Sequence, residues 1–360
     1  MEINIKTLTV QKATSLKKIP SENELSFGKD FTDHMFIMDY DPENGWHNPR
    51  IQPYDAIPIE PGLITFHYGQ TVFDGLKAYY GIDGKIRFFR VMDYLRRFNN
   101  SAKGLCIPEF NIDELYEYLK QLILLDKNWI PKKEGTSLYI RPLIIASDNA
   151  LGVRTSNTYK MFIILSPVGS YYSEGFNPVK ILVEETYSRT APGGLGACKT
   201  AANYASSLYG AELAKKKGFT QVLWLDACMK KYVEEVGTMN IFFRIDDDLI
   251  TPPLEGTILP GITRDSIIKI AKDKGIHVCE RKISIDEVFN AHDNGKLKEV
   301  FGSGTAAIIS PVGLLSYKGR EIVINNFQTG EWSKEFFELI TSWHHGKAVD
   351  PYGWITILED

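Results

Sequence analysis

The sequence lacks the usual marks of a disulfide-stapled or metal-binding protein. Its 360 residues include only four cysteines and seven histidines. The cysteines are scattered without a CxxC pair, and no histidine stands in an HExxH or comparable arrangement. Because zinc sites and disulfide frameworks normally show such spacings, we expect neither of them. We predict no metal site and a cytoplasmic protein.

Strong charge and long apolar runs are also absent. The net charge is −4, so nothing favours nucleic acid or a membrane surface as a partner. No apolar run approaches the roughly 20 residues that span a bilayer, and the first residues contain no continuous apolar core typical of a signal peptide. Apolar residues make up 44% of the chain, as in ordinary globular proteins. The length allows two domains, each with its own core.

Short strand-like runs and helical patterns alternate along the chain, which predicts an α/β or α+β fold. Residues 169–178 are rich in glycine, serine, proline and aromatic residues and lie between two strand-like runs, so they are the best linker candidate. We therefore predict a small N-terminal domain at 1–168, this linker at 169–178, and a large C-terminal domain at 179–360.

Hydrophobic spacing and end signals place the individual elements. Asn111 is a good N-cap for the pattern that follows it, and Ser284 with Glu287 forms a capping box. Gly261 marks the start of another helix. Helices are predicted at 92–104, 111–129, 200–217, 261–275, 284–295 and 331–346. Strands are predicted at 34–41, 85–90, 137–147, 159–169, 179–186, 221–227, 239–245, 298–301 and 307–313.

A glycine-rich loop at 191–200, APGGLGACKT, nearly matches the phosphate-binding P-loop. Gly193, Lys199 and Thr200 fit that pattern, but Cys198 replaces a glycine, and its side chain would intrude on a phosphate nest. The preceding strand also ends well before the loop, whereas a P-loop follows its strand directly. A nucleotide-binding role is therefore disfavoured.

Two other interpretations concern cofactors. GSGTAA at 302–307 matches a dinucleotide fingerprint, but the residues after it look extended, and the fingerprint requires a helix there. Alternatively, Lys199 reacts with a carbonyl group, which requires a partly desolvated amine. Small residues leave open space around Lys199; they are Gly193, Gly194, Gly196, Ala197, Ala201 and Ala202. Taken alone, Lys199 could equally be a solvated surface lysine.

Four motifs taken together decide between these interpretations. They are GACKTAANY at 196–204, EEVGTMNIFF at 234–243, LPGITRDSI at 259–267 and EVFGSGTAA at 299–307. Their order and spacing resemble the branched-chain amino acid aminotransferases, which are pyridoxal phosphate enzymes of fold type IV. The resemblance covers about residues 25–345. It implies a small α/β N-terminal domain and a larger α+β C-terminal domain.

The resemblance also implies how pyridoxal phosphate is bound. Lys199 would hold the cofactor as a Schiff base and act as the catalytic residue. Glu235 would pair with the pyridine nitrogen, while its neighbour Glu234 points to the other face of an extended segment. Further cofactor contacts are implied for Arg97, Arg189, Tyr204, Ile262, Thr263 and Thr305. Ile262 and Thr263 begin a helix, whose N-terminal N–H groups suit a phosphate.

For the substrate, the resemblance implies an apolar pocket with a carboxylate clamp. The backbone N–H groups of Thr305 and Ala306 and the Tyr68 hydroxyl would bind the carboxylate, with Arg141 as an anchor. Leu151 and Val153 would reach in from a second subunit. The implied pocket walls are Phe27, Tyr68, Phe73, Tyr139 and Tyr204.

The activity implied is a reversible, ping-pong transfer of an amino group between leucine, isoleucine or valine and 2-oxoglutarate. The partners would be these small molecules and, in a homodimer, a second copy of the chain. A D-amino acid aminotransferase or an aminodeoxychorismate lyase of the same fold is the alternative, and the segments HYGQTVFDG and SLYIRP argue against both. A P-loop nucleotide-binding protein and a cofactor-free binding module are more remote alternatives.

Overall fold

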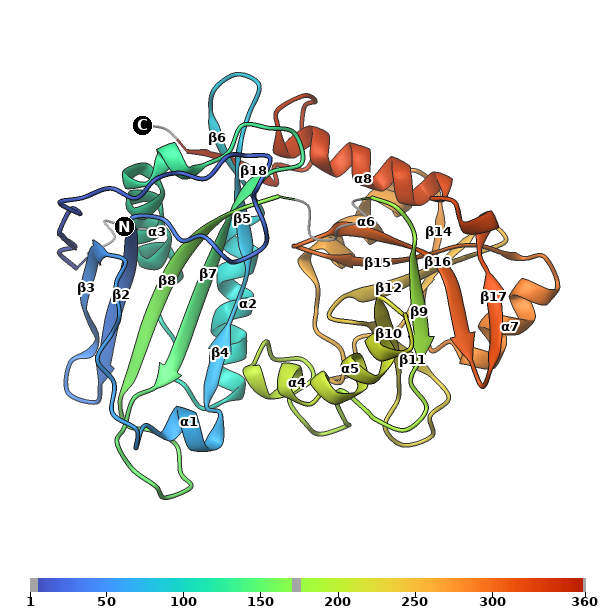
Figure 1. Cartoon of the computed structure of the whole chain (residues 1–360), viewed down its shortest axis with the longest axis horizontal. Coiled ribbons are helices and arrows are strands. Elements are labelled where there is room, and N and C mark those ends of the chain that lie inside the picture. The colour runs from blue at the N-terminus through green and yellow to red at the C-terminus, as the bar shows by residue number, and fades with distance from the viewer. Residues whose placement is uncertain (1–5, 170–175, 359–360) are drawn as a thin grey trace. The chain divides into compact units, whose positions relative to one another are not determined.

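The computed structural model describes residues 6–169 and 176–358. It divides into two compact units, each built on one sheet (Figure 1). Unit 1 comprises Met1–Tyr171, Cys198–Ala201 and Ser342–Asp360, and unit 2 comprises Tyr172–Ala197 and Ala202–Thr341. Most of the predicted linker at 169–178 falls in 170–175, outside the described residues.

The sheet of unit 1 is largely antiparallel. Its two longest strands, β7 and β8, pair over ten residues, and they coincide with the two apolar runs from which strands were predicted. The sheet order is β1-β3-β2-β8-β7-β5-β6-β18, and β4 also pairs with β7. The strands are β1 (Thr9–Val10), β2 (His34–Asp41), β3 (Gly45–Pro53), β4 (Thr71–Phe73), β5 (Leu76–Tyr80), β6 (Ile86–Phe89), β7 (Ser137–Ala146), β8 (Tyr159–Val168) and β18 (Ile355–Leu358).

The two long helices of unit 1 cover this sheet with their apolar faces. In α3, a stripe of residues at helical spacing is buried, including Leu115, Leu119 and Leu122. The predicted N-cap of this helix is confirmed, because the Asn111 side chain accepts hydrogen bonds from the backbone N–H groups of Asp113 and Glu114. The helices of unit 1 are α1 (Ile64–Tyr68), α2 (Val91–Gly104), α3 (Ile112–Leu125) and the 3-10 turn η1 (Lys127–Trp129).

Replacing Asn111 with alanine is expected to lower the free energy of unfolding by about 1 kcal/mol, because two N–H groups of the first turn lose their acceptor. Urea denaturation would measure the change. Asn111→Asp keeps an acceptor oxygen at the N-cap and is the matched control, so it should stay close to the parent. Equal losses in the two variants would show that the cap bond does not carry the stability.

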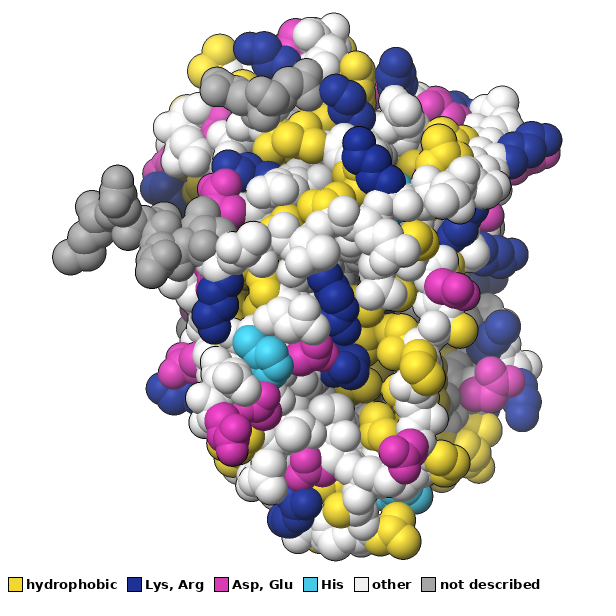
Figure 2. Space-filling view, turned by 90° about the vertical axis from the view of Figure 1, so that its left-hand side faces the viewer, with side chains coloured by type: hydrophobic (Ala, Val, Ile, Leu, Met, Phe, Trp, Pro, Cys, Tyr) yellow, Lys and Arg dark blue, Asp and Glu magenta, His cyan; other side chains and the backbone are white. Residues whose placement is uncertain are grey.

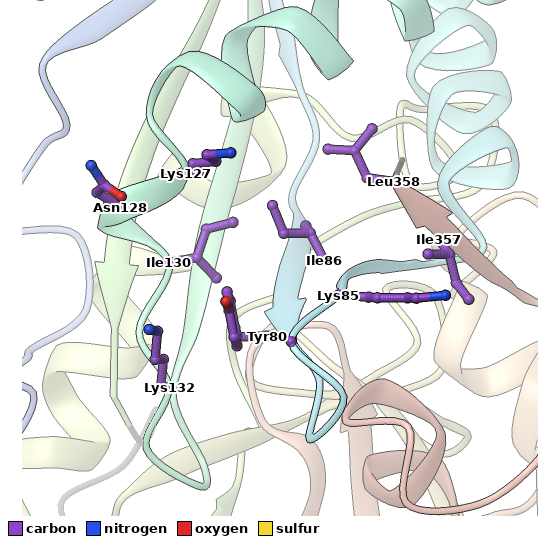
Figure 3. Close-up of a pocket in the computed structure, with 10 residues that line it drawn as sticks. Tyr80, Lys85, Ile86, Lys127, Asn128, Ile130, Lys132, Ile357 and Leu358 are labelled. Atoms are coloured by element: carbon purple, nitrogen blue, oxygen red, sulfur yellow. The ribbon is translucent and has the colours of Figure 1, made fainter. Parts of the chain in front are cut away.

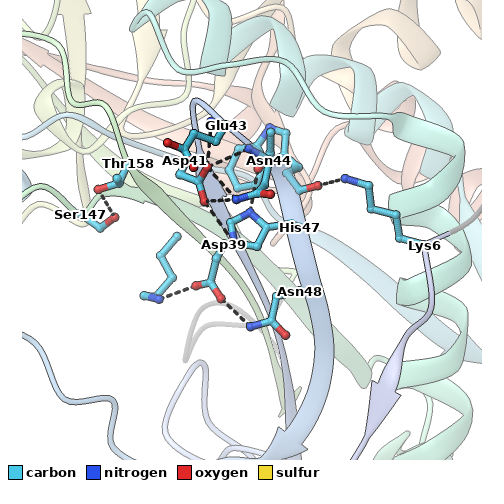
Figure 4. A network of polar contacts seen from close by, with 12 residues as sticks. Lys6, Asp39, Asp41, Glu43, Asn44, His47, Asn48, Ser147 and Thr158 are labelled. Carbon is cyan, nitrogen blue, oxygen red and sulfur yellow. Dashed lines mark hydrogen bonds and ion pairs between the residues drawn. The ribbon is translucent and has the colours of Figure 1, made fainter.

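Polar side chains fix the tip and the flank of the β2–β3 hairpin (Figure 4). Asp41 accepts hydrogen bonds from the backbone N–H groups of Glu43 and Asn44, at 2.9 and 2.8 Å, which is a common way to close a tight turn. Asp39, on the same strand, binds Asn48 at 3.0 Å and forms ion pairs with Arg50 and Lys160. These contacts set the register of the hairpin at the edge of unit 1.

The sheet of unit 2 is mixed. Strand β16 lies at its centre and pairs parallel with β9 and antiparallel with β15. The sheet order is β11-β10-β9-β16-β15-β12-β13-β14, and β17 also pairs with β16. The strands are β9 (Val179–Val183), β10 (Gln221–Leu225), β11 (Val233–Val236), β12 (Asn240–Ile245), β13 (Asp248–Thr251), β14 (His277–Glu280), β15 (Leu297–Gly304), β16 (Ile308–Tyr317) and β17 (Arg320–Val323).

Two helix starts of unit 2 agree with the sequence. Gly261 is the N-cap of α6, and the Ser284 hydroxyl accepts the N–H of Glu287 at the start of α7. The Glu287 carboxylate pairs instead with Arg281 at 2.6 Å, so the structure records one half of the predicted capping box. The elements are α4 (Ala201–Ala205), α5 (Leu208–Lys216), α6 (Ile262–Asp273), α7 (Ile285–Asp293), α8 (Glu331–His344) and the 3-10 turn η2 (Asn325–Phe327).

The single helix predicted at 200–217 was wrong, because it is broken into α4 and α5. The Ser206 hydroxyl donates to the carbonyl oxygens of Asn203 and Arg189, at 3.0 and 2.7 Å. The Ser207 hydroxyl donates to the carbonyl oxygen of Tyr204 at 2.7 Å. Serine hydroxyls that bind nearby carbonyls compete with the helical hydrogen bonds. Two adjacent serines therefore interrupt a segment whose apolar spacing is continuous.

The division into units does not follow the chain linearly. The prediction assigned everything from 179 onward to the C-terminal domain, whereas Ser342–Asp360 groups with unit 1. Strand β18 pairs antiparallel with β6, from Ile355 opposite Phe89 to Leu358 opposite Ile86. Pairing between strands so distant in sequence leaves no local signal, so the assignment of the C-terminal residues to unit 1 could not be predicted from the sequence.

Basic and acidic side chains are interspersed on the face shown in Figure 2, as the small net charge of −4 suggests. Across residues 6–169 and 176–358, the helices are all too short or too polar to pass through a lipid bilayer.

Candidate active site

The segment that carries Lys199 is bound to unit 1 through its backbone. The N–H of Lys199 donates to the Ser101 hydroxyl at 2.9 Å, and its carbonyl accepts the N–H of Phe73 at 3.0 Å. The Thr200 hydroxyl donates to the Thr71 carbonyl at 2.7 Å. The Lys199 Nζ lies 5.1 Å from the centre of the Phe73 ring. Lys199 is thus held beside β4 and α2, although its neighbours in sequence belong to unit 2.

Four of the predicted substrate residues form one cluster in unit 1. The Arg141 guanidinium lies 4.8 Å from the Phe73 ring centre and 5.3 Å from that of Tyr139. Its Nη2 donates to the Tyr139 hydroxyl at 3.1 Å, while its Nε is buried without a hydrogen-bond partner among the described residues. Phe27 meets Tyr139 edge to face at 4.8 Å. Because Phe73 also contacts Lys199, the cluster adjoins the predicted catalytic lysine.

The remaining predicted substrate residues of unit 1 lie on exposed segments. The Tyr68 hydroxyl, at the end of α1, donates to the Leu151 carbonyl. Tyr68 is 42% exposed, and Leu151 and Val153 are 69% and 82% exposed. Single exposed apolar side chains are normal on protein surfaces, so the predicted contact of this loop with a second subunit stays a prediction.

Arg97 is held by a buried carboxylate that the sequence did not reveal. Its Nε and Nη2 donate to the two carboxylate oxygens of Asp74, at 3.0 and 2.6 Å, and both side chains are buried. A two-point contact of this kind fixes the plane of a guanidinium. The adjacent Arg96 points outward, as predicted, with its side chain 59% exposed.

Lys77 is a second residue that sequence analysis missed. It is 8% exposed and stands opposite Tyr139 in the pairing of β5 with β7, so it shares a face with that ring. Burial lowers the pKa of Lys77 to about 8. The signal was available in the sequence, since Lys77 follows Phe73 and Gly75 at alternate positions, but one lysine in an apolar stretch is easily assigned to solvent.

Replacing Lys77 with methionine is expected to stabilise the protein at pH 7 by up to about 3 kcal/mol. The charged amine is disfavoured in the folded state, so its cost is fully present below pH 8 and disappears as the pH rises toward the unfolded value of 10.5. Urea denaturation at pH 7 and pH 10 would show a gain that shrinks with pH. The exposed Lys85, changed to methionine, is the control. An equal gain at both pH values would contradict this explanation.

In unit 2, Glu235 forms the centre of a buried polar cluster. It makes an ion pair with Arg189, and both side chains are almost fully buried. The Asn240 side chain lies 3.4 Å from the Glu235 carboxylate and donates to the Leu259 carbonyl at 3.0 Å. The Arg189 guanidinium lies 5.2 Å from the Tyr204 ring centre. Three predicted cofactor residues of this unit thus lie together, and Asn240 joins them without having been predicted.

Glu234 occupies a different environment from Glu235, as predicted. Burial raises the pKa of Glu234, and the nearby charge of Glu235 acts in the same direction. The Thr190 hydroxyl lies 3.4 Å from its carboxylate. Glu234 lines a pocket of about 340 Å³, together with Tyr232, Thr257 and ten other residues. The two neighbouring glutamates therefore lie in different surroundings.

The other predicted residues of unit 2 lie at a helix start and a strand end. Ile262 and Thr263 begin α6, whose N-terminus has no side-chain cap. Thr305 and Ala306 lie in the turn between β15 and β16, which spans residues 305–307. The strand after this turn excludes the dinucleotide interpretation. Ile308, the first residue of that strand, has a φ of 64°, a strained value for a β-branched residue, and such strain is common at functional sites.

Unit 1 also contains a pocket of about 400 Å³ where β6 begins (Figure 3). Lys132 lies over the Tyr80 ring, 4.9 Å from its centre. All lining residues fall outside the set predicted for cofactor and substrate; they are Tyr80, Gly84, Lys85, Ile86, Lys127, Asn128, Ile130, Lys132, Ile357 and Leu358. This pocket is therefore separate from the candidate active site.

Known proteins match the chain over nearly its full length. The class IV amino-transferase family matches residues 71–315. A curated relative, branched-chain-amino-acid aminotransferase 2 of Bacillus subtilis (strain 168), is 53% identical over 350 residues, which cover 97% of this chain and 96% of the relative.

Solved structures agree with this match. The branched-chain amino acid aminotransferase of Escherichia coli has a TM-score of 0.75 and 28% identity, covering 91% of this chain and 99% of that chain. The T.th. enzyme of the same name, complexed with N-(5'-phosphopyridoxyl)-L-glutamate, has a TM-score of 0.73 and 27% identity, covering 90% and 98%. These likenesses confirm the predicted type IV fold. The chain therefore belongs to the class IV aminotransferases and, within them, to the branched-chain amino acid aminotransferases.

Proposed function

We propose that this transaminase moves an amino group between leucine, isoleucine or valine and 2-oxoglutarate, in a reversible ping-pong cycle. The observation that carries the proposal is the cluster of Phe27, Phe73, Tyr139 and Arg141 beside Lys199. It combines aromatic walls for an aliphatic side chain with a cation that suits a carboxylate. Its residues come from separate segments of the chain, so the fold assembles the cluster.

Pyridoxal phosphate is the cofactor that we propose, and the residues present fit it. The buried Arg189 Nε and Ser303 Oγ lack hydrogen-bond partners among the described residues, and buried polar groups rarely remain unpaired. The T.th. relative binds a phosphopyridoxyl-glutamate adduct. When bound, the cofactor would supply an electron sink for the substrate Cα–H bond.

We assign the cofactor contacts by the chemistry of each residue. Lys199 Nζ would hold the cofactor covalently and, once released, carry the proton taken from the substrate Cα. Glu235, positioned by Arg189 and Asn240, would hold the proton on the pyridine nitrogen, and Tyr204 would donate to the ring oxygen. The phosphate would be bound by Arg97, by the N-terminus of α6 at Ile262 and Thr263, and by Thr305.

The substrate would be bound by two kinds of group. Phe27, Phe73 and Tyr139 would enclose the aliphatic side chain, and one methylene more or less changes binding by only about 1–3 kcal/mol, so all three branched substrates should react. Arg141, the Tyr68 hydroxyl and the N–H groups of Thr305 and Ala306 would bind the carboxylate. In the proposed homodimer, Leu151 and Val153 would reach the partner's pocket. The cytoplasmic location stays a prediction from composition.

Turnover measurements test the proposed substrates. The purified protein should convert L-leucine with 2-oxoglutarate into glutamate, and L-isoleucine and L-valine should react at rates of the same order. D-alanine and aminodeoxychorismate represent the two alternative activities of this fold. A higher kcat/KM for either of them than for L-leucine would overturn the proposed function.

The cofactor is tested separately. The protein as purified should be yellow, and borohydride should bleach the colour and leave the cofactor covalently attached to the peptide that contains Lys199, as seen by mass spectrometry. A colourless protein that takes up no added pyridoxal phosphate would refute the cofactor assignment.

A further inference from the structure

A cluster of three potential metal ligands lies on unit 2, outside the candidate active site. His277 and Cys279 alternate along β14, so their side chains share one face. Asp248 stands opposite His277 in the parallel pairing of β13 with β14. One ligand atom from each residue lies within 4.8 Å of the other two. The sheet register, and not a loop, brings them together.

The contacts converge on a single nitrogen atom. His277 Nδ1 lies 2.9 Å from an Asp248 carboxylate oxygen and 3.5 Å from the Cys279 sulfur. In a catalytic Cys-His-Asp arrangement, one ring nitrogen accepts the proton of the thiol. The other ring nitrogen binds the acid, which holds the imidazole in the correct orientation. Here the acid and the thiol face the same nitrogen. The arrangement therefore does not suit a nucleophile and fits groups that surround a common point.

The spacing suits tetrahedral zinc. Zinc binds nitrogen and oxygen at about 2.0–2.2 Å and thiolate sulfur at about 2.3 Å, so ligand atoms around it lie roughly 3.3–3.6 Å apart. The sulfur-to-nitrogen distance of 3.5 Å already matches, whereas the Asp248 oxygen has to move away from the nitrogen, from its present 2.9 Å, and to settle within ligand distance of the sulfur, from which it now lies no more than 4.8 Å away. The side chains of His277 and Asp248 are 74% and 48% exposed, which leaves room for water as a fourth ligand.

We propose that Asp248, His277 and Cys279 form a zinc-binding site that joins β13 to β14. The ligand set has one carboxylate, one imidazole and one thiolate, all of which zinc accepts. Strand β14 lies at the edge of its sheet, next to β13. A metal ion bound across the two strands ties this edge to the rest of unit 2. No metal site could be predicted from the sequence, because Asp248 is remote from His277 along the chain and a single HxC pair is a weak signal.

Metal titration of the holoenzyme tests the proposal without measuring turnover. After chelator treatment and desalting, zinc added in competition with a chromophoric chelator should bind once per chain. Cobalt, bound in its place, should give the absorption of tetrahedral cobalt and a thiolate-to-cobalt charge-transfer band. The midpoint of thermal unfolding should rise with added zinc, since the ion binds the folded state.

Three variants remove one ligand each: Asp248→Asn, His277→Ala and Cys279→Ser. We expect at least a tenfold loss of zinc affinity in the histidine and cysteine variants, and loss of the charge-transfer band in Cys279→Ser. Cys228→Ser removes another exposed thiol and should bind as the parent does. Zinc affinity that is unchanged in Cys279→Ser, or lost equally in Cys228→Ser, would overturn the proposal, as would a parent protein that binds less than one zinc per chain.

Discussion

Replacing Lys199 with alanine is expected to lower kcat for leucine by about 10⁴-fold or more. The amine has two proposed roles, to hold the cofactor and to carry the substrate proton, and positioned acid–base groups alone contribute about 10²–10⁴-fold. The backbone around Lys199 is fixed by Ser101, Phe73 and Thr71. Truncating its side chain should therefore leave the loop in place. Steady-state and single-turnover kinetics would measure the loss.

Three comparisons identify the cause of the lower kcat in Lys199→Ala. Lys217→Ala, on the exposed end of a helix, should keep the parent rate. Lys199→Arg keeps the charge but cannot readily give up its proton, so it should be as inactive as the alanine variant. Added methylamine should restore part of the activity of Lys199→Ala, by replacing the missing proton carrier. Normal turnover by Lys199→Ala would contradict both proposed roles.

Replacing Glu235 with glutamine is expected to lower kcat by about 10²–10³-fold, the usual effect of removing one preorganised electrostatic group. The same change leaves Arg189 buried beside a neutral side chain. Breaking a buried ion pair in this way costs about 3–5 kcal/mol of folding free energy. Lower activity and lower stability should thus appear together. Steady-state kinetics would measure the change in kcat and KM, and urea denaturation would measure the change in the free energy of unfolding.

A double variant separates the two effects. Adding Arg189→Met to Glu235→Gln removes the uncompensated charge, so stability should largely return while kcat stays low. Glu234→Gln is the matched control, because burial already raises the pKa of Glu234 and favours its neutral form. The kcat of this control should stay within about tenfold of the parent value. This is a smaller loss than the one expected when a preorganised electrostatic group is removed. Recovery of kcat in the double variant would show that Glu235 acts only through stability.

Local signals in the sequence predicted several helix starts and the strands with the longest apolar runs, and they missed many of the shorter strands. The side chains of Asn111 and Ser284 accept hydrogen bonds from backbone N–H groups of the first helical turn, as predicted. This prediction was possible because N-capping depends on only three or four consecutive residues. The long apolar runs at β7 and β8 could become strands regardless of their partners. The predicted residues around Glu235 and around Lys199 came from motifs taken together, since each motif alone was ambiguous.

Other features depend on contacts that the sequence does not encode locally. The break between α4 and α5 follows from serine hydroxyls that bind carbonyls, one of them on Arg189. The role of Asp74 is visible only once Arg97 lies against it, and the position of Lys77 only once β7 places Tyr139 beside it. The cluster at His277 needs the register of two parallel strands. In each case the deciding partner is remote in sequence.

The pairing of β6 with β18 has a consequence for the newly made chain. Strand β6 ends at residue 89 and its partner begins at residue 355, so a ribosome that adds about 5–20 residues per second needs roughly 15–50 s to connect them. During that time the hydrogen-bonding edge of β6 has no neighbour on that side. Uncovered strand edges recruit other strands. For much of its own synthesis, the polypeptide therefore carries a strand edge that is open to association with other chains.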